Sequence, residues 1–427
     1  MIQDIMPGTE GNLMEGMKVG YIGFDPTAPS LTVGNLVALM LLKHFQDCGH
    51  KPIVVMGGAT GMIGDPSGKA EERKLLSPGV IQENLEHQKE QFLKFLNFEE
   101  KENSAEIVNN YDWFKNTSLL DFLRDVGKHL TVSYMLAKDS VKSRLEGGLS
   151  FTEFSYQLLQ GYDFYHLYEN KKCTLQMGGS DQWGNITAGT ELIRRMGGGE
   201  AFALTTPLLT KADGTKFGKS EKGNIWLDPK LTSPYQFYQF WINTPDLEAS
   251  KYLRYFTTLN QESIVALEKE HLETPHQRIL QKALAEELTI RVHSKNDLDR
   301  AIKASELLFG NSSGEESIQF LKNLTELELA DYFLDVFEAE NDKGQDDVGP
   351  SFMNTNNLPI SILDLVLKYE IFPSKSEARK MILGGGISIN KVKQTDENKK
   401  MDKEDFLHGS YLLLQKGKKN YFLLKWK

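Results

Sequence analysis

The sequence predicts an α/β protein: a parallel-sheet domain followed by an α-helical domain and a small α+β domain. Three observations support this fold class. Short apolar runs that end in glycine alternate with helical segments in the N-terminal half. The apolar spacing then becomes helical throughout, and a polar linker separates this region from a basic C-terminal segment. Alternating strands and helices imply right-handed crossovers and a parallel sheet.

The N-terminal elements follow from periodicity. Residues 17–26 and 51–58 (MKVGYIGFDP and KPIVVMGG) are short apolar runs that lead into proline or glycine loops, as buried strands do. Residues 36–49 place apolar side chains at helical spacing and stop at a glycine, which is typical of a helix end. The same pattern predicts further strands at residues 173–179 and 204–210 and further helices at residues 77–96 and 181–196.

The rest of the chain is predicted to form three parts. A region without clear strands has helical spacing, an acidic stretch interrupted by glycine and proline marks a linker, and a helix, a glycine turn and lysine-rich strands follow. The predicted boundaries are 1–225 for the parallel-sheet domain, 226–337 for the helical domain, 338–357 for the linker and 358–427 for the C-terminal domain.

The composition excludes several classes of protein. The 427 residues carry a formal charge of −10, which argues against a protein that coats nucleic acid nonspecifically. Residues 356–427 nevertheless hold fourteen Lys and Arg against eight Asp and Glu, so this segment is predicted to have its own anionic partner. Cys48 and Cys173 lie far apart, so neither a disulfide nor a metal site is expected. Without a secretory signal or an apolar run of about 20 residues, the protein is predicted to be cytoplasmic, with no membrane association.

Ligand chemistry is predicted where the strands end, because ligands of open parallel sheets bind beyond the carboxyl ends of the strands. Three loops qualify, at residues 23–35, 57–73 and 178–185, and each is rich in glycine or small polar residues. The first loop leads into a helix N-terminus, whose free N–H groups and partial positive charge suit phosphate.

Each loop also has a simpler interpretation. Thr32 fits an ordinary N-cap residue, and Gly34 fits a helix-entry glycine. Lys69 and Arg73 also fit an exposed basic pair on a solvated turn. Asp181 has the two carboxylate oxygens that a ribose diol needs, but it equally fits a helix N-cap. Taken one at a time, the loops leave these alternatives open.

Residues 211–224 (KADGTKFGKSEKGN) contain four lysines and three glycines and almost no apolar side chain. A segment that cannot bury itself is predicted to be an exposed, mobile loop. Either its charge only keeps the surface soluble, or the loop closes over an anion. No GxGxxG or GxxxxGK[ST] spacing occurs in the sequence, which argues against a dehydrogenase and a P-loop ATPase.

Four stretches occur in this order along the chain: DPTAPSLTVGN, GDPSGK, GGSDQWGN and ADGTKFGKS. Their combination closely resembles the bacterial tyrosyl-tRNA synthetases, a family of class I aminoacyl-tRNA synthetases, over essentially the whole chain. TVGN (Thr32–Asn35) stands where that family carries its HIGH signature, and KFGKS (Lys216–Ser220) where it carries KMSKS. The resemblance implies a Rossmann-like catalytic domain, an α-helical anticodon-side domain and a C-terminal RNA-binding domain.

The resemblance also implies an activity and its substrates. The family activates L-tyrosine with ATP and Mg²⁺ to tyrosyl-adenylate and transfers tyrosine to the 3′-terminal adenosine of tRNA(Tyr). Attack by a carboxylate needs no general base, so the protein has to position the reactants and stabilise charge. No tightly bound cofactor and no metal-ligating residues are expected. The family is homodimeric, and Gly148–Tyr156 lies in its subunit-contact region.

Site residues carry over from the matching positions of the family. The catalytic group comprises Thr27, Thr32, Asn35, Lys69, Arg73, Lys216 and Lys219, whose cations are expected to clamp the departing pyrophosphate. The ATP-binding group comprises Gly23, Asp25, Gly34, Gly179, Asp181 and Lys219. The tyrosine-binding group comprises Tyr21, Asp65, Tyr156, Gln160, Asp163, Gln176 and Gln182. The RNA-binding group comprises Lys375, Arg379, Lys380, Lys391 and Lys393.

The tyrosine-binding group depends most on the resemblance. Tyr21 and Asp163 are expected to pair with the phenol hydroxyl of the substrate, and Asp65 with its ammonium group. From the residues alone, Tyr21 fits a core aromatic and Asp163 a helix-surface acid.

Two positions depart from the family signature. Thr32 replaces the usual first histidine, and a threonine reaches less far and cannot become cationic. Loss of one preorganised donor lowers a rate by about 10²–10³, so we expect a working enzyme that is slower unless a residue such as Thr27 compensates. Asn35 replaces the last histidine, and its amide N–H can still donate to the nucleotide.

Two other functions compete with tyrosine activation and can be distinguished from it. The related tryptophan enzyme shares the architecture, but the polar pair Tyr21 and Asp163 suits a phenol better than an indole. The second rival is a non-catalytic RNA-binding relative of the family. Thr32 slightly favours this function, whereas Lys216 and Asp181, which match the family motifs, argue against it.

Overall fold

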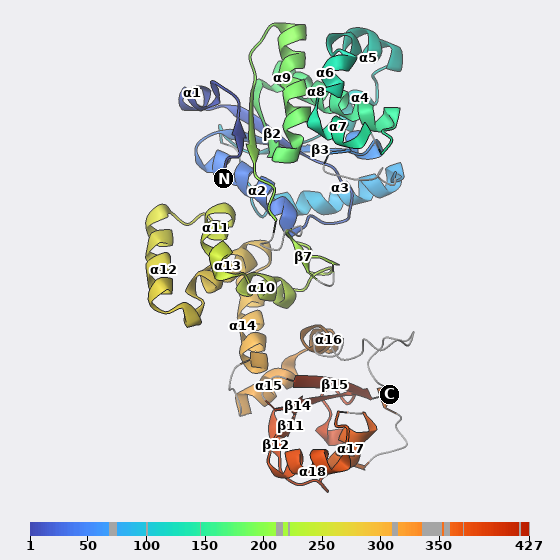
Figure 1. The fold of residues 1–427 in the computed structure, drawn as a ribbon, viewed down its shortest axis with the longest axis vertical. Helices are drawn as coiled ribbons and strands as arrows, with labels where there is room; N and C mark the ends of the chain where they lie inside the picture. The colour runs from blue at the N-terminus through green and yellow to red at the C-terminus, as the bar shows by residue number, and fades with distance from the viewer. Residues whose placement is uncertain are drawn as a thin grey trace. The chain divides into compact units, whose positions relative to one another are not determined.

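Figure 1 shows the computed structural model of the chain. It describes residues 1–67, 75–99, 101–145, 147–210, 217–220, 223–309, 315–334, 352–353, 359–369, 371–417 and 420–426. The contacts divide the chain into two compact units, Met1–Thr232 with Phe240–Ser294, and Ser233–Gln239 with Lys295–Lys427. The division of the chain into four parts at the boundaries given above stays a prediction.

The first unit contains a six-stranded sheet with the order β1-β6-β5-β2-β3-β4. β2 to β6 pair in parallel, whereas β1 pairs with β6 antiparallel. The predicted parallel sheet is therefore confirmed, with an antiparallel strand added at one edge. The strands are β1 (Asp4–Ile5), β2 (Val19–Phe24), β3 (Lys51–Met56), β4 (Glu106–Asn109), β5 (Cys173–Gly179) and β6 (Phe202–Thr206).

The differences from prediction lie at the ends and edges of the sheet. β1 and β4 are short edge strands whose side chains are all only partly buried, so they carry little apolar signal. The strand predicted at residues 204–210 begins earlier and ends at Thr206. Pro207 follows it and has no amide N–H to donate to a neighbouring strand.

Helices cover both faces of this sheet. α2 (Leu36–Asp47) and α3 (Pro78–Phe92) lie on one face, and α8 (Phe151–Lys171) and α9 (Trp183–Gly197) lie on the other (Figure 1). Because both faces are covered, β3 is buried from Pro52 to Met56 and reads as a continuous apolar run.

The remaining helices of the first unit are shorter or follow the sheet in sequence. α10 contributes residues to both units, and α11 packs against α13 and α2. These helices are α1 (Thr9–Met14), α4 (Tyr111–Phe114), α5 (Leu119–Asp125), α6 (Val132–Leu136), α7 (Asp139–Leu145), α10 (Pro234–Ile242), α11 (Asp246–Phe256), α12 (Gln261–Glu273) and α13 (Ile279–Val292).

α8 and α9 approach each other closely through two glycines. A Cβ atom on Gly161 of α8 would lie 3.6 Å from the backbone of Gly189 of α9, and a Cβ atom on Gly189 would lie 2.9 Å from the Phe164 ring. Ser150 and Glu153 form a capping box at the start of α8. The close packing fixes the spacing of the polar side chains that the two helices present to the end of the sheet.

The order of the strands creates a crevice. From β2 the chain passes to β3 on one side, and from β5 it passes to β6 on the other side, so the direction of winding reverses between the neighbours β2 and β5. Loops that leave these two strands diverge, and ligands of doubly wound sheets bind at such a point.

The second unit contains three further helices and the C-terminal α+β fold. Its five-stranded sheet has the order β12-β11-β14-β15-β9, antiparallel except that β9 pairs with β15 in parallel. A core of Ile362, Val366, Ile382, Ile387 and Leu412 lies between this sheet and its helices. The elements are α14 (Lys295–Phe309), α15 (Glu315–Asn323), α16 (Glu326–Leu334), β9 (Phe352–Met353), β10 (Ile360–Ser361), α17 (Ile362–Lys368), α18 (Lys375–Leu383), β11 (Ile387–Ile389), β12 (Val392–Gln394), β13 (Lys400–Met401), β14 (Tyr411–Lys416) and β15 (Asn420–Trp426).

Candidate active site

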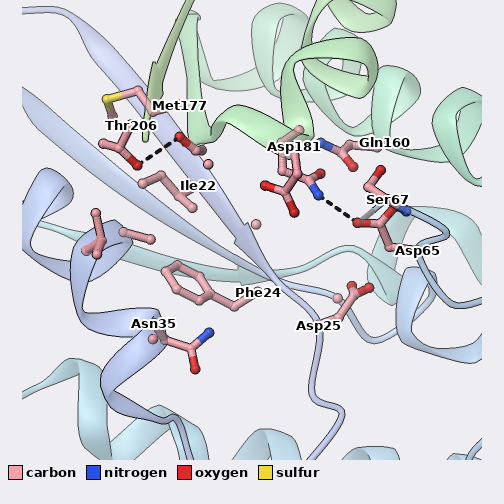
Figure 2. A pocket seen from close by; sticks show the side chains of 18 of the residues that line it. Ile22, Phe24, Asp25, Asn35, Asp65, Ser67, Gln160, Met177, Asp181 and Thr206 are labelled. Atoms are coloured by element: carbon pink, nitrogen blue, oxygen red, sulfur yellow. Dashed lines mark hydrogen bonds between the residues drawn. The ribbon is translucent and has the colours of Figure 1, made fainter. Parts of the chain in front are cut away.

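A cavity of about 520 Å³ lies at the carboxyl ends of β2 and β5, where the crevice is expected (Figure 2). Every predicted catalytic, ATP-binding and tyrosine-binding residue that the structure describes with its side chain lines this cavity, except Thr32. Those lining residues are Tyr21, Gly23, Asp25, Thr27, Gly34, Asn35, Asp65, Tyr156, Gln160, Asp163, Gln176, Gly179, Asp181 and Gln182.

One end of the cavity is built around the Asp163 carboxylate; we call Tyr21, Asn110, Trp113 and Asp163 the Asp163 end. Asp163 is 3% exposed and accepts hydrogen bonds from Trp113 Nε1 at 2.8 Å and from Asn110 Nδ2 at 3.0 Å. Burial raises the pKa of the Asp163 carboxyl to about 7, although the two hydrogen bonds oppose the shift. Asp163 is thus a buried acid, and its interpretation as a surface acid is wrong.

The Tyr21 hydroxyl lies at the same end and has no hydrogen-bond partner among the described residues, although it is fully buried. Burial, and then the nearby Asp163, raise the pKa of Tyr21, so the hydroxyl keeps its proton. Its ring meets Phe164 edge-on, with 5.4 Å between the centroids. A buried hydroxyl without a partner costs free energy, so this group is arranged for a polar atom that none of the described residues supplies.

The other end of the cavity, the Asp65 end, comprises Asp65, Ser67, Gln160, Gln182 and Asn185. Asp65 accepts hydrogen bonds from Gln182 Nε2 at 2.7 Å and from the Ser67 backbone N–H at 2.9 Å. Asn185 Nδ2 lies 3.2 Å from both Gln160 Oε1 and Gln182 Oε1. Figure 2 shows Asp65, Ser67 and Gln160 together on one side of the cavity. The carboxylate is held in place, and the site as a whole is suited to a cation.

A chain of hydrogen bonds connects the middle of the cavity to the Asp163 end. Tyr156 donates to Asp25 Oδ2 at 2.8 Å, and Thr60 donates to Asp25 Oδ1 at 2.8 Å. Asn110 donates in turn to the Thr60 hydroxyl at 2.9 Å and, as described above, to Asp163. Tyr156 and Asp25 are therefore linked through Thr60 and Asn110 to the Asp163 carboxylate.

The network includes residues that the sequence analysis does not predict. Asn110 and Trp113 follow β4, and Thr60 follows β3, so each stands at the carboxyl end of a parallel strand. That position is the signal that could have found them, but β4 itself is not predicted. Ser67 and Asn185 lie inside two of the predicted loops, and both form hydrogen bonds with residues of the Asp65 end.

Open, glycine-lined space lies between the two ends and the start of α2. Gly34 and Asn35 line it on the α2 side, and Gly179 and Asp181 line it on the β5 side. A Cβ atom on Gly179 would lie 2.6 Å from Asp181 Oδ1, so a side chain at this position would displace the carboxylate. Burial, and then the charge of Asp65, raise the pKa of Asp181. The carboxylate of Asp181 faces a cavity wide enough for a planar, polar ligand.

The predicted cations around this space lie at the limits of the described chain. Lys69, Arg73 and Lys216 fall outside the described residues, and only the backbone of Lys219 is described, in the short strand β7 (Lys219–Ser220) that pairs with β8 (Gly223–Asn224). Phe217 is buried, and its ring packs against a cluster formed by Phe240, Trp241, Tyr252 and Phe256.

The predicted RNA-binding residues divide into two groups. Lys375, Arg379 and Lys380 on α18 and Lys393 on β12 are exposed; we call these four residues the basic face.

Lys391 departs from this pattern. It is 7% exposed, and its ammonium group donates to the carbonyl of Leu307 and, at 2.6 Å, to the Tyr421 hydroxyl. Asn390 and Lys391 form a two-residue hairpin turn with φ of 47° and 69°, which directs Lys391 inward. This placement contradicts the expected phosphate contact of Lys391, because an ammonium group buried with two partners is not available to RNA.

Two absences concern the described parts of the chain alone. No helix there is both long and apolar enough to cross a membrane. No group of three or more His, Cys, Asp or Glu side chains there is placed to hold a metal ion.

Sequence comparisons cover the whole chain. Residues 16–310 match the family described as class I tRNA synthetases (W and Y), and residues 340–424 match the tyrosine–tRNA ligase SYY-like C-terminal domain. The tyrosine–tRNA ligase of Cytophaga hutchinsonii is 58% identical over 425 residues, which span 100% of this chain and 97% of the relative. That of Porphyromonas gingivalis is 55% identical over 430 residues, or 99% and 97% of the two chains.

Solved structures show the same similarity. A C-terminally truncated mitochondrial tyrosyl-tRNA synthetase from Aspergillus nidulans is 32% identical, has a TM-score of 0.64, and covers 72% of this chain and 91% of its own. The full-length similarity to tyrosine–tRNA ligases decides between the tyrosine and tryptophan branches of the matched family. The chain is a class I aminoacyl-tRNA synthetase and belongs to the tyrosine–tRNA ligase family.

Proposed function

We propose that the cavity binds L-tyrosine with its phenol hydroxyl between Tyr21 and Asp163 and its ammonium group beside Asp65. One observation carries this proposal. The buried Tyr21 hydroxyl lacks a partner among the described residues, and the Asp163 carboxylate beside it is already held by two donors. A phenol hydroxyl can donate to Asp163 and accept from Tyr21, so it satisfies both groups.

The same pairing provides selectivity against phenylalanine. A substrate without the hydroxyl would leave Tyr21 and Asp163 buried and unsatisfied, which costs more than a missing apolar contact. Tyrosyl-tRNA synthetases are themselves the established example of this form of discrimination. At the opposite end, Asp65 is buried and fixed by Gln182 and Ser67, so it can pair with an ammonium group without moving.

ATP, entering as its Mg²⁺ complex, is proposed to occupy the glycine-lined space between Asn35 and Asp181. Asp181 would accept hydrogen bonds from the ribose hydroxyls, and Thr27, Gly34 and Asn35 would face the nucleotide. The tyrosine carboxylate attacks the α-phosphate, a C–O–P bond forms, and the bond to the β-phosphate breaks, so pyrophosphate leaves with the electron pair. The protein contributes orientation and charge stabilisation to this step.

Lysine and arginine side chains are proposed to assist adenylate formation, and a tRNA hydroxyl is proposed to complete the reaction. Lys69, Arg73, Lys216 and Lys219 are proposed to stabilise the departing pyrophosphate, because charge accumulates on it in the transition state. A hydroxyl of the 3′-terminal adenosine of tRNA(Tyr) then attacks the tyrosyl carbonyl, and AMP leaves. The basic face is proposed to contact tRNA phosphates.

We further propose a cytoplasmic homodimer. Exposed apolar side chains, Leu119 and Leu120 on α5, Val132 on α6 and Phe151 on α8, lie in or next to the region that resembles the family's subunit contact. Large exposed apolar groups on neighbouring elements are typical of an interface. Sedimentation of the protein at micromolar concentration as a monomer would contradict this part of the proposal.

The central test is ATP–pyrophosphate exchange with tyrosine, tryptophan or phenylalanine as the only amino acid. We expect exchange with tyrosine alone. The Tyr21→Phe variant should lose part of its discrimination against phenylalanine, whereas Tyr162→Phe, a matched change on α8 whose ring packs against Phe114 and Phe122, should keep it. No tyrosine-dependent exchange, or equal selectivity in the two variants, would reject the proposed binding mode.

A further inference from the structure

Thr32 stands where the family signature has a histidine, yet the structure does not place it on the cavity wall. Gly34 and Asn35 line the cavity, whereas Thr32 is not among the described residues that do so. Its backbone instead forms an isolated bridge with Trp226, and the Val33 N–H donates to Ile225 O at 2.9 Å. A direct contact between Thr32 and a bound nucleotide therefore has little geometric support.

Thr32 directs two hydrogen bonds at one atom. Its backbone N–H donates to Asn35 Oδ1 at 2.9 Å, and its hydroxyl donates to the same Oδ1 at 3.0 Å. The Asn35 N–H closes the turn by donating to Thr32 O at 2.9 Å. The Asn35 side chain is thus held by its neighbour before the helix α2 begins.

These bonds fix which way the Asn35 amide points. A backbone N–H can only donate, so the atom that faces Thr32 has to be the amide oxygen. The amide nitrogen then faces the opposite way, and Figure 2 shows it directed toward the cavity. No hydrogen bond donated by this nitrogen is found among the described residues, so two N–H donors are available to a ligand.

The chemistry of the hydroxyl leads to the same conclusion. A threonine hydroxyl has one hydrogen, and here that hydrogen is directed at Asn35 Oδ1. A phosphate or a ribose ring oxygen only accepts hydrogen bonds, so Thr32 cannot donate to it while it holds Asn35. Asn35, whose oxygen is occupied and whose nitrogen faces the cavity, can.

From these contacts we infer that Thr32 is a positioning residue: it orients the Asn35 amide, which the proposed function already places beside the nucleotide, so that the amide nitrogen faces the ligand. The inference rests on the proposed function of the cavity and adds to it a division of roles within the signature. In this chain the first signature position orients the last one, and it does not replace the missing histidine as a ligand of the phosphates.

The test is a double-mutant cycle with two matched changes at Thr32. Thr32→Val keeps the shape and removes the hydroxyl, whereas Thr32→Ser keeps the hydroxyl and removes the methyl group. Each is made with Asn35 and with Asn35→Ala, and tyrosine-dependent ATP–pyrophosphate exchange is measured as a function of ATP and of tyrosine. Residues in direct contact show coupling in such a cycle, and independent ligands do not.

We expect Thr32→Val to lower kcat/KM for ATP about fivefold and to leave KM for tyrosine unchanged, and Thr32→Ser to recover most of the loss. In the Asn35→Ala background, Thr32→Val should have no further effect. An equal loss in both backgrounds would mean that Thr32 contacts the nucleotide itself and would overturn the inference. No loss in either background, or an equal change in both KM values, would overturn it as well.

Two controls separate other failures. Absence of tyrosine-dependent exchange in the unaltered protein would count against the proposed function, not against the role of Thr32. Tyrosine binding by equilibrium dialysis verifies that each variant is folded. If Thr32→Val does not bind tyrosine, Thr32→Ala takes its place in the cycle with the same expected outcome.

Discussion

The Asp163 end of the cavity and the basic face of the C-terminal domain present charge in opposite ways. At the Asp163 end, Tyr21 and Asp163 are 1% and 3% exposed, and fixed donors hold the carboxylate. On the basic face, Lys375, Arg379 and Lys380 are exposed along one helix. Buried, paired groups distinguish one small molecule from another, because a mismatch leaves them unsatisfied. Exposed cations attract any polyanion and lose that attraction in salt.

The comparison leads us to expect that amino-acid selectivity depends on single side chains, whereas tRNA affinity depends on several. Substitutions at the two regions should therefore differ in size, in salt dependence and in the step that they change. The five predictions below run from the largest expected effect to the smallest.

Replacement of the buried acid should have the largest effect. Asp163→Ala removes the acceptor of the Trp113 Nε1–H and of one Asn110 hydrogen bond, and it removes the proposed partner of the substrate hydroxyl. We expect kcat/KM for tyrosine to fall by about 10²–10³ in the exchange assay, the range seen when a preorganised polar group is lost. A loss below tenfold would show that the Asp163 end does not recognise the phenol.

The same acid should also produce a pH dependence. Because the pKa of Asp163 is raised to about 7, the unliganded protein holds a proton on this group below pH 7 and loses it above. The ionised carboxylate accepts a stronger hydrogen bond from the phenol than the protonated acid does, so tyrosine binding should weaken as the pH falls from 8 to 6. Asp163→Asn should show a weaker affinity that does not change over this interval, and a parallel pH profile in the two proteins would contradict the assignment.

A smaller effect is expected from the residue that holds the acid. Trp113→Phe removes the Nε1 donor to Asp163 but keeps a ring against His166, with which Trp113 stacks at 4.5 Å between centroids. We expect KM for tyrosine to rise about tenfold, since a hydrogen bond to a charged group is lost. His166→Ala is the control, because it removes the ring stack and keeps the hydrogen bond from Trp113 to Asp163. An equal rise in KM in this variant would show that ring packing, and not the hydrogen bond, is responsible.

The basic face should respond less, and in a different assay. Lys375→Ala combined with Lys380→Ala should weaken tRNA binding about fivefold at physiological salt and lower the slope of log affinity against log salt by about 2. Tyrosine-dependent exchange should not change. Lys89→Ala combined with Lys128→Ala, at exposed lysines of the first unit, is the charge-matched control. If the control lowers the salt slope as much, the basic face has no special role.

The smallest effect is expected at Lys391, which lies beside the basic face but is buried. Lys391→Met should leave the salt slope of tRNA binding unchanged and should alter the free energy of unfolding by about 1 kcal/mol. Burial lowers the pKa of Lys391 to about 8, so between about pH 8 and 10 the unfolded chain holds a proton that the folded protein has released. Stability of the unaltered protein should therefore rise with pH in this interval relative to Lys391→Met, as measured by thermal unfolding. A reduced salt slope of tRNA binding in the variant would instead show that Lys391 contacts RNA phosphate.

Much of the fold was predictable because local signals and packing agree. β2, β3 and β5 are largely buried, so their sequences are mostly apolar, and α2 and α9 end at Asp47 and Gly197, close to their predicted limits. β1 and β4 were not predictable, since an edge strand needs only a few half-buried residues. The local pattern therefore identified the centre of the sheet better than its margins.

The candidate site was predictable only in part, and for a different reason. Asp163 lies on a helix whose exposed and buried faces depend on α9 and β5, so its burial is a tertiary property and only the family resemblance pointed to it. Asn110 and Trp113 bind another side chain, and no local pattern marks such a role. Lys391 shows the opposite case: the basic segment predicts an exposed lysine, whereas the turn Asn390–Lys391 directs the side chain inward.

The width of the proposed amino-acid pocket is fixed partly by residues that do not line it. Gly189 leaves room for Phe164, and the Phe164 ring supports the ring of Tyr21. Any side chain at Gly189 would press, through Phe164, on the wall that faces the substrate. Redesign of this enzyme for bulkier ring-substituted amino acids would have to preserve that glycine, because the available room depends on how closely α8 and α9 approach and not only on the lining side chains.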